Sequence, residues 1–177
     1  MTFARVRAMV LIGALTVVGL IVALVTVFSD DQASGGASAG CKAGQPYADT
    51  EIRQEDKITV SVYNGTGRAG VAAAVAADLS DRGFKAKAEK NDPNQADVDG
   101  VGMVRYGPEG VGSAQVVRAY LFGEATREYD PNKKGAAVDL IVGKNFVELA
   151  RLTDKNIALA DLGQPEAPAG TCERAAG

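Results

Sequence analysis

Apolar and polar residues alternate along residues 57–64, and the period changes a few residues later. The apolar positions are Ile58, Val60 and Val62, and the residues between them are polar or amphipathic. This period of two is typical of a strand with one face in a core. From Val71 onward the apolar residues recur at helical spacing, and Gly83 stands where a helix is expected to end. The stretch therefore predicts a strand, a tight polar turn and a helix in succession.

Further elements follow from the same patterns downstream. Strands are predicted at residues 84–89, 101–106, 126–129 and 137–142, and a second helix at residues 113–122. Asn145 followed by Glu148 has the spacing of a capping box, which predicts a short third helix. The order β-α-β-β-α-β predicts an α/β (α+β) two-layer sandwich, with two main helices on one face of a mixed β-sheet. Because the strands alternate, the other face is expected to be wet.

A charge-free run of 20 residues, 9–28, precedes this domain. At about 1.5 Å per residue it is long enough for a hydrocarbon core of roughly 30 Å. Arg5 and Arg7 place the N-terminus in the cytoplasm, so we expect one transmembrane helix with an extracytoplasmic C-terminal domain in the cell membrane. The alternatives are a cleaved signal peptide, a lipoprotein modified at Cys41, and a buried core helix.

The remaining segments differ in composition. Residues 29–40 contain mainly Gly, Ala, Ser and Asp, and the chain beyond Leu162 is rich in Pro, Ala and Gly. Such compositions bury little apolar surface. We therefore expect a cytoplasmic N-terminus at residues 1–8, the anchor at 9–28, a tether at 29–56, the domain at 57–152, and a C-terminal extension and tail at 153–177.

Composition excludes several kinds of chemistry. The chain contains no His, which removes His-ligated metals and His-based acid/base catalysis. The formal net charge is −3; without Arg5 and Arg7, 17 basic and 22 acidic residues remain, or −5. A domain of that sign gains no counterion-release affinity for nucleic acid. We therefore expect no enzyme activity, no cofactor, no metal and no nucleic-acid partner.

The turn after the first strand contains the pattern G-x-G-x-x-G, from Gly65 to Gly70. This pattern binds dinucleotides when it joins a buried parallel strand to a helix. Here the preceding strand alternates, and the domain is short for two mononucleotide-binding halves. The favoured interpretation is structural: Asn64, Gly65 and Gly67 form the turn, since Asn and Gly both tolerate positive φ, and Gly70 allows close helix packing. Nucleotide binding and another anion at the helix N-terminus are the alternatives.

Candidate binding residues are few. Arg68 begins the first helix and Arg105-Tyr106 end the third strand, so they could lie at the same end of the sheet. The favoured interpretation is a surface salt bridge or solvated charge, and a ligand site is the alternative. The candidate set is Asn64, Gly65, Thr66, Gly67, Arg68, Arg105 and Tyr106. Asp92, Asp97 and Asp99 lack the spacing of a calcium loop and are interpreted as a solvated loop.

Cys41 and Cys172 are the two cysteines and bracket the predicted domain, 172 − 41 = 131 positions apart. The predicted topology places both in an oxidising compartment, where disulfides persist. We therefore predict a bond between them. Free thiols, intermolecular pairing and a lipid on Cys41 are the alternatives.

Several motifs resemble those of the LytR C-terminal domain family over residues 57–149. They are the strand and turn ending at Gly67, the helix exit at 81–84, the stretch 104–108, and the last strand at 138–143 followed by Asn145-Phe146. In many relatives this domain follows a phosphotransferase domain that attaches polymers to the cell wall. That domain has no counterpart in this sequence, so its activity is not carried over.

The resemblance implies a non-enzymatic role in envelope integrity, in which the domain binds a cell-wall component or an envelope membrane protein. One alternative is a regulatory or docking subunit of a wall-polymer ligase. A more remote alternative is a nucleotide-binding enzyme that uses the loop from Gly65 to Gly70.

Overall fold

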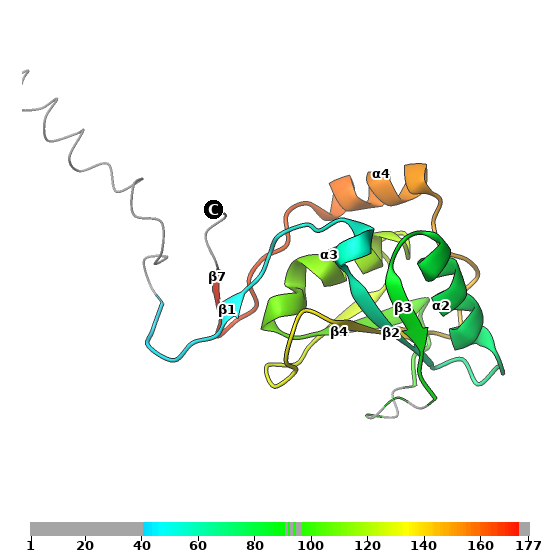
Figure 1. Ribbon diagram of the computed structural model, residues 1–177, viewed down its shortest axis with the longest axis horizontal. Helices are drawn as coiled ribbons and strands as arrows, with labels where there is room; N and C mark the ends of the chain where they lie inside the picture. The colour runs from blue at the N-terminus through cyan, green and yellow to red at the C-terminus, as the bar shows by residue number, and fades with distance from the viewer. Residues whose placement is uncertain (1–40, 91, 93, 95–96, 174–177) are drawn as a thin grey trace, which may run out of the picture. The chain divides into compact units, whose positions relative to one another are not determined.

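The computed structural model describes residues 41–90, 92, 94 and 97–173 (Figure 1). The predicted anchor, 9–28, and the first part of the tether lie outside these residues. Within the described part, no helix is long and apolar enough to cross a membrane.

The elements confirm the predicted mixed α/β fold. A first group comprises β1 (Tyr47–Ala48), η2 (Glu55–Lys57), β2 (Thr59–Asn64), α2 (Val71–Asp81) and β3 (Lys85–Ala88). A second comprises β4 (Gly102–Tyr106), η3 (Pro108–Gly110), α3 (Val111–Ala119), β5 (Thr126–Tyr129) and β6 (Val138–Val142). The chain ends with α4 (Leu152–Leu162) and β7 (Cys172–Glu173).

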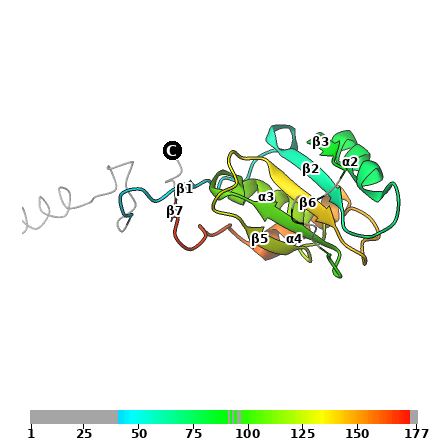
Figure 2. The ribbon, with the colours of Figure 1, turned by 90° about the horizontal axis from the view of Figure 1, so that it is seen from below.

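Five strands form a mixed sheet in the order β3-β2-β6-β4-β5. β3, β2 and β6 are parallel to one another, and β4 and β5 run in the opposite direction. The sheet thus contains two βαβ units, β2-α2-β3 and β4-α3-β5, on either side of β6. Crossovers of this kind are right-handed. The two βαβ units are therefore related by a half-turn about the sheet normal, which places α2 and α3 on the same face. Figure 1 shows both helices on one side, and Figure 2 shows the strands from below.

The main core lies between the sheet and these helices. The strand residues that face the helices are fully buried: Val60, Val62, Val104, Leu140 and Val142. They pack with Val75 and Leu79 of α2 and with Val116 and Val117 of α3. α4 packs outside α3, where Gln115 Nε2 donates to the carbonyl oxygens of Leu162 and Gly163 at 3.2 and 3.1 Å.

The third helix begins later than the capping-box pattern predicts. The expected cap at Asn145 is wrong, because α4 begins at Leu152 and Arg151 is its N-cap residue. The Asn145 N–H donates to Gly100 O (3.1 Å), and the Ala150 N–H donates to Tyr120 O (2.8 Å). These bonds to other parts of the fold hold the intervening chain out of a helix, which local spacing does not reveal.

The opposite face of the sheet is less wet than expected. Asp139 and Arg105, neighbours across β6 and β4, are 8% and 3% exposed. Arg105 pairs with Asp92 from the β3–β4 connection at 2.6 Å, and Lys133 from the β5–β6 loop pairs with Asp139 at 2.9 Å. Ile141, on the same face, is fully buried but lies outside the main core cluster. This face is therefore covered by loops and ion pairs over β6 and β4, whereas on β2 and β3 its residues are half-buried or exposed.

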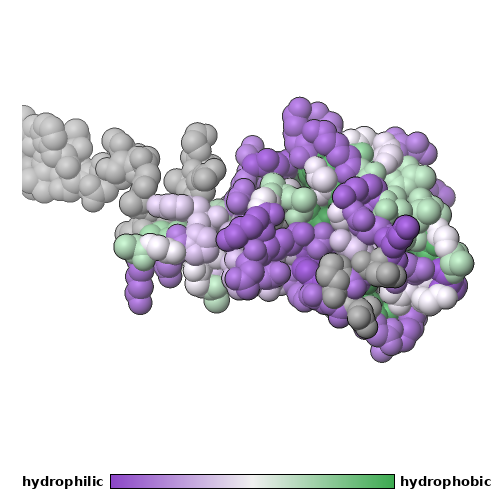
Figure 3. Space-filling model, turned by 60° about the horizontal axis from the view of Figure 1, so that its bottom comes forward, coloured by the Kyte–Doolittle hydropathy of each residue, from purple (hydrophilic) through white to green (hydrophobic). Residues whose placement is uncertain are grey.

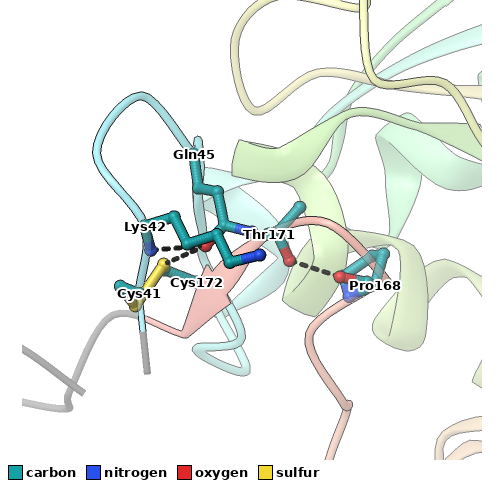
Figure 4. Close-up of a disulfide and its surroundings, with 6 residues drawn as sticks. All are labelled: Cys41, Lys42, Gln45, Pro168, Thr171 and Cys172. Atoms are coloured by element: carbon teal, nitrogen blue, oxygen red, sulfur yellow. Dashed lines mark hydrogen bonds between the residues drawn. A yellow bond between two sulfur atoms is a disulfide. The ribbon is translucent and has the colours of Figure 1, made fainter. Parts of the chain in front are cut away.

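The predicted disulfide between Cys41 and Cys172 is confirmed, with 5.7 Å between the Cα atoms (Figure 4). Beside it, β1 and β7 pair in parallel, and the Cys172 N–H donates to Pro46 O at 2.9 Å. Residues 41–56, which the sequence assigns to the tether, pack against η3 and α3: the Asp49 N–H donates to Pro108 O (2.8 Å) and the Gly112 N–H to Asp49 O (2.9 Å). The chain therefore enters and leaves the domain at one place.

Candidate functional site

The turn between β2 and α2 is held by its own side chains. Asn64 Nδ2 donates to Arg68 O at 2.6 Å, and Asn64 Oδ1 accepts from the Thr66 backbone N–H at 3.0 Å and hydroxyl at 2.7 Å. The Arg68 N–H donates to Thr66 Oγ1 at 3.0 Å. The amides of Thr66 and Arg68 are therefore engaged within the turn and are not free to bind a phosphate, which argues against the dinucleotide alternative.

Positive φ angles in this turn occur at Gly67 (72°) and Gly70 (82°), and not at Gly65. Gly65 therefore does not use the positive φ that an Asn-Gly pair tolerates. The Gly65 N–H instead donates to Val142 O at 2.9 Å and continues the ladder between β2 and β6. A Cβ at Gly67 or Gly70 would meet no atom within 4 Å, so backbone conformation and not space requires glycine there.

Three other loops meet this turn. In the strand register, Asn64 lies opposite Val142, and Val142 lies opposite Gly102. Beyond them, the N–H groups of Gly143 and Lys144 donate to Val101 O and Val98 O at 3.1 and 2.8 Å. We call the region comprising residues 64–70, 97–101, 121–124 and 143–149 the pocket end of the domain. It contains the carboxyl ends of the parallel strands β2 and β6, where ligands bind in many open α/β sheets.

A pocket of about 240 Å³ lies in this region. Its lining combines apolar side chains with two glutamates and one amide: Val101, Leu121, Phe122, Glu124, Asn145, Phe146, Val147 and Glu148. Val147 is 87% exposed and Phe122 45%, although both are large apolar residues. Hydrophilic residues cover most of the face in Figure 3, and apolar residues gather toward its right-hand end, where β2 passes into α2 in Figure 1.

Phe122 is held in a strained backbone conformation. Its φ of 55° is positive, which no other non-glycine residue of the described chain shows, and Gly123 follows at 78°. The guanidinium of Arg118 fixes this turn by donating to Gly123 O at 3.1 Å and to Ala125 O at 2.9 Å. Strain of this kind persists when the surroundings over-determine the conformation, and it is concentrated at functional sites.

Charges at the pocket end comprise the Arg68 guanidinium, which bonds to Phe146 O, one ion-paired cluster around Lys144, and two carboxylates in the pocket lining. Lys144 Nζ lies 2.8 Å from carboxylate oxygens of both Asp97 and Asp99, and hydrogen bonds to these two groups raise the pKa of Lys144. In contrast, the exposed Glu124 and Glu148 have no ion-pair partner among residues that the structure describes. The pocket rim therefore carries two uncompensated negative charges.

The aspartates of the 92–99 stretch do not converge. Asp97 and Asp99 contact Lys144, whereas Asp92 contacts Arg105. Within the described ranges, no group of three or more His, Cys, Asp or Glu residues is arranged to hold a metal ion.

Arg105 and Tyr106 lie elsewhere, so the juxtaposition with Arg68 that the sequence allowed does not occur. β4 runs antiparallel to β6, and Arg105 is three residues beyond Gly102, about 10 Å farther along the strand. The Arg105 guanidinium is buried against Asp92 and Glu128, and hydrogen bonding to Asp92 raises its pKa. Tyr106 is 5% exposed and packs on Tyr129 in the core. Neither residue lines the pocket.

Of the predicted site residues, Arg68 is hydrogen-bonded to a residue of the pocket lining, since its guanidinium donates to Phe146 O at 3.3 Å. Sequence reasoning missed the lining itself. One signal was present in the Leu121-Phe122 pair. Successive residues lie about 100° apart on a helix. If Leu121 is on the buried side, the same spacing therefore turns Phe122 away from it.

Comparison with known proteins shows similarity to a family and to a relative whose names refer to the cell envelope. Residues 57–146 match the LytR_C family, described as LytR cell envelope-related transcriptional attenuator. The chain is 35% identical over 105 residues to the cell envelope integrity protein Cei of Mycobacterium tuberculosis. The aligned region covers 58% of this chain and 48% of that protein. The chain thus spans about half the length of this curated relative.

The fold is also similar to a solved structure, the soluble domain of a conserved hypothetical secreted protein from Mycobacterium marinum. The TM-score is 0.53 and the sequence identity 31%, over 71% of this chain and 82% of that one.

Proposed function

The chain belongs to the LytR_C family, and from this premise we propose that it is a membrane-anchored envelope protein whose extracytoplasmic domain acts by binding and not by catalysis. Residues 9–28 form the single-pass anchor in this proposal. The partner is a cell-wall component or an envelope protein, and a docking subunit of a wall-polymer ligase is one form of the second case.

The position of the chain ends supports the anchored arrangement. Residue 41, to which the tether leads, is bonded to Cys172, so both termini leave the domain beside β1 and β7. The pocket end lies at the other ends of β2 and β6. A disulfide of this kind fits an oxidising, extracytoplasmic compartment, and the structurally similar protein from Mycobacterium marinum is described as secreted.

One observation carries the binding role: the pocket end exposes large apolar side chains on a rigid backbone. The polar groups of Asn64, Thr66 and Arg68 bond to one another and to the fold, as structural groups do. Phe122 and Val147 instead face solvent beside a pocket, and apolar groups exposed in this way mark interaction sites.

The proposal is tested by deleting the gene in its host and measuring ethidium uptake as a readout of the envelope barrier. We expect ethidium uptake to rise in the deletion strain, and expression of the full chain to restore the envelope barrier. A chain with Val147→Ser is expected to fail, whereas Ile157→Ser, which changes an exposed apolar residue of α4 outside the pocket, is expected to restore the barrier. A deletion strain with an unaltered barrier, or full rescue by Val147→Ser at equal protein level, would contradict the proposal.

A further inference from the structure

The lining of the pocket defines the chemistry of its occupant. We infer that the pocket takes one apolar side chain of a partner protein segment that carries a lysine or arginine next to that side chain. This inference rests on the proposed binding function and narrows it to a protein partner.

The size of the pocket favours a side chain. Its volume of about 240 Å³ is below the range of about 300–1,000 Å³ typical of sites for drug-sized ligands. Leu121 in the lining is 2% exposed, and Phe122, Phe146 and Val147 complete an apolar wall. Such a cavity fits a single anchor side chain, of the kind that is buried at the centre of many protein interfaces.

The charges at the rim favour a cation beside that anchor. Glu124 and Glu148 both line the pocket, and both lack an ion-pair partner within the part of the chain described. Two such carboxylates repel anionic polymers and attract an ammonium or guanidinium group. The Asn145 side chain adds one amide to the lining that is suited to a peptide backbone.

The pocket walls are fixed before any partner arrives. Arg118 clamps the turn that carries Phe122, and Arg68 bonds to Phe146 O. The backbone of Lys144 and Asn145 is bonded to Val98 and Gly100. A preformed site loses little entropy on binding, so a short segment is sufficient to occupy it.

The test uses the full chain in detergent micelles and NMR titration with three synthetic octapeptides. Each has a central leucine, flanked by two lysines, two glutamines or two glutamates. We expect the lysine peptide to bind about fivefold more tightly than the glutamine peptide, and the glutamate peptide most weakly, because an exposed ion pair contributes up to about a fivefold factor. The shifted signals are expected at Leu121, Phe122 and Val147.

Variants separate the two parts of the inference. Glu124→Gln combined with Glu148→Gln is expected to bring the lysine peptide to the affinity of the glutamine peptide. Val147→Ser is expected to weaken all three, and Ile157→Ser none.

Two results would overturn the inference: equal affinity for the three peptides, or shifts confined to residues outside the pocket. Binding of a purified disaccharide-peptide wall fragment at the pocket, without peptide preference, would overturn it while leaving the proposed function standing. An unaltered envelope barrier in the deletion strain, with the peptide preference intact, would overturn the function alone.

Discussion

The two ends of the sheet are built in different ways. At the end that holds β1 and β7, which we call the disulfide end, Cys41 and Cys172 are bonded and Ala48 is fully buried. At the pocket end, Val147 is 87% exposed and Phe122 occupies a strained turn. The disulfide end is closed covalently and by the burial of Ala48, although Tyr47 beside it is 46% exposed. The pocket end has no covalent closure and exposes Val147 and a strained Phe122 next to a pocket.

This difference suggests a division of labour along the strands. Strain and exposed apolar groups lower stability and persist only when the rest of the fold supplies a surplus. The disulfide closes a loop spanning 131 positions, and it also holds the two exits of the chain together. The first and last described residues, Cys41 and Glu173, therefore lie at the disulfide end and leave the pocket lining accessible to a partner.

Removal of the disulfide is expected to cause the largest loss of stability, and it affects the disulfide end. Cys172→Ser should lower the free energy of unfolding by on the order of 4–5 kcal/mol, because the unfolded chain regains the entropy of the open loop. Urea unfolding of the full chain, followed by circular dichroism, measures this loss. The NMR signals of Val147 should be unchanged below the transition, because the lost bond lies at the other end.

The control is Cys41→Ser, alone and together with Cys172→Ser. Both single variants and the double variant should lose the same stability, since each removes the same bond. Unequal losses, or a stability unchanged by a reductant, would show that the bond does not support the disulfide end.

A second pair of substitutions perturbs the two ends of the sheet separately. A Cβ at Gly112 would overlap Glu51 O, and a Cβ at Gly143 would overlap Gly100 O. Each alanine variant is expected to destabilise the domain by about 1–3 kcal/mol, since packed backbone must shift. Hydrogen exchange should rise at Asp49 in Gly112→Ala and at Lys144 in Gly143→Ala.

Gly100→Ala is the matched control, because a Cβ there meets no atom within 4 Å. It should leave stability within about 0.5 kcal/mol of the parent chain. If Gly112→Ala increased exchange at Lys144 as much as at Asp49, the two ends would be one cooperative unit and the comparison would fail.

The sequence predicts well what local patterns determine. The alternation of Ile58, Val60 and Val62 places β2 with its core face correctly, and the helical period from Val71 predicts α2. These features depend on neighbours in the chain. The disulfide was also predictable, because the predicted topology puts both cysteines in an oxidising compartment and leaves few choices of partner.

What the sequence did not predict depends on distant contacts. The antiparallel placement of β4 beside β6 separates Arg105 from Arg68, and strand order does not follow from alternation. The delay of α4 to Leu152 results from backbone bonds to Gly100 and Tyr120. The exposure of Phe122 depends on a clamp by Arg118 that no spacing rule contains. The pocket was missed for this reason.

The smallest expected effect isolates the strain at the pocket end. Phe122→Ala and Phe122→Gly both remove the ring, but only alanine keeps a Cβ at φ 55°. A left-handed conformation costs an L-residue about 1 kcal/mol and glycine almost nothing. Phe122→Gly should therefore be more stable than Phe122→Ala by roughly that amount, reduced by the extra backbone entropy that glycine loses on folding. Parallel urea unfolding of the two variants measures the difference.

Peptide binding should not follow this difference in stability. Both variants lose the aromatic wall of the pocket, so both should bind the lysine peptide equally weakly, whatever their stability. The stability difference then reports strain, and the shared loss of binding reports the ring. If Phe122→Gly were less stable than Phe122→Ala by the full glycine entropy of about 0.5–1 kcal/mol, no strain would be held at Phe122. Undiminished peptide binding would show that the exposed ring serves no partner. Either outcome would remove the contrast with the disulfide end, because the pocket end would then be an ordinary loop.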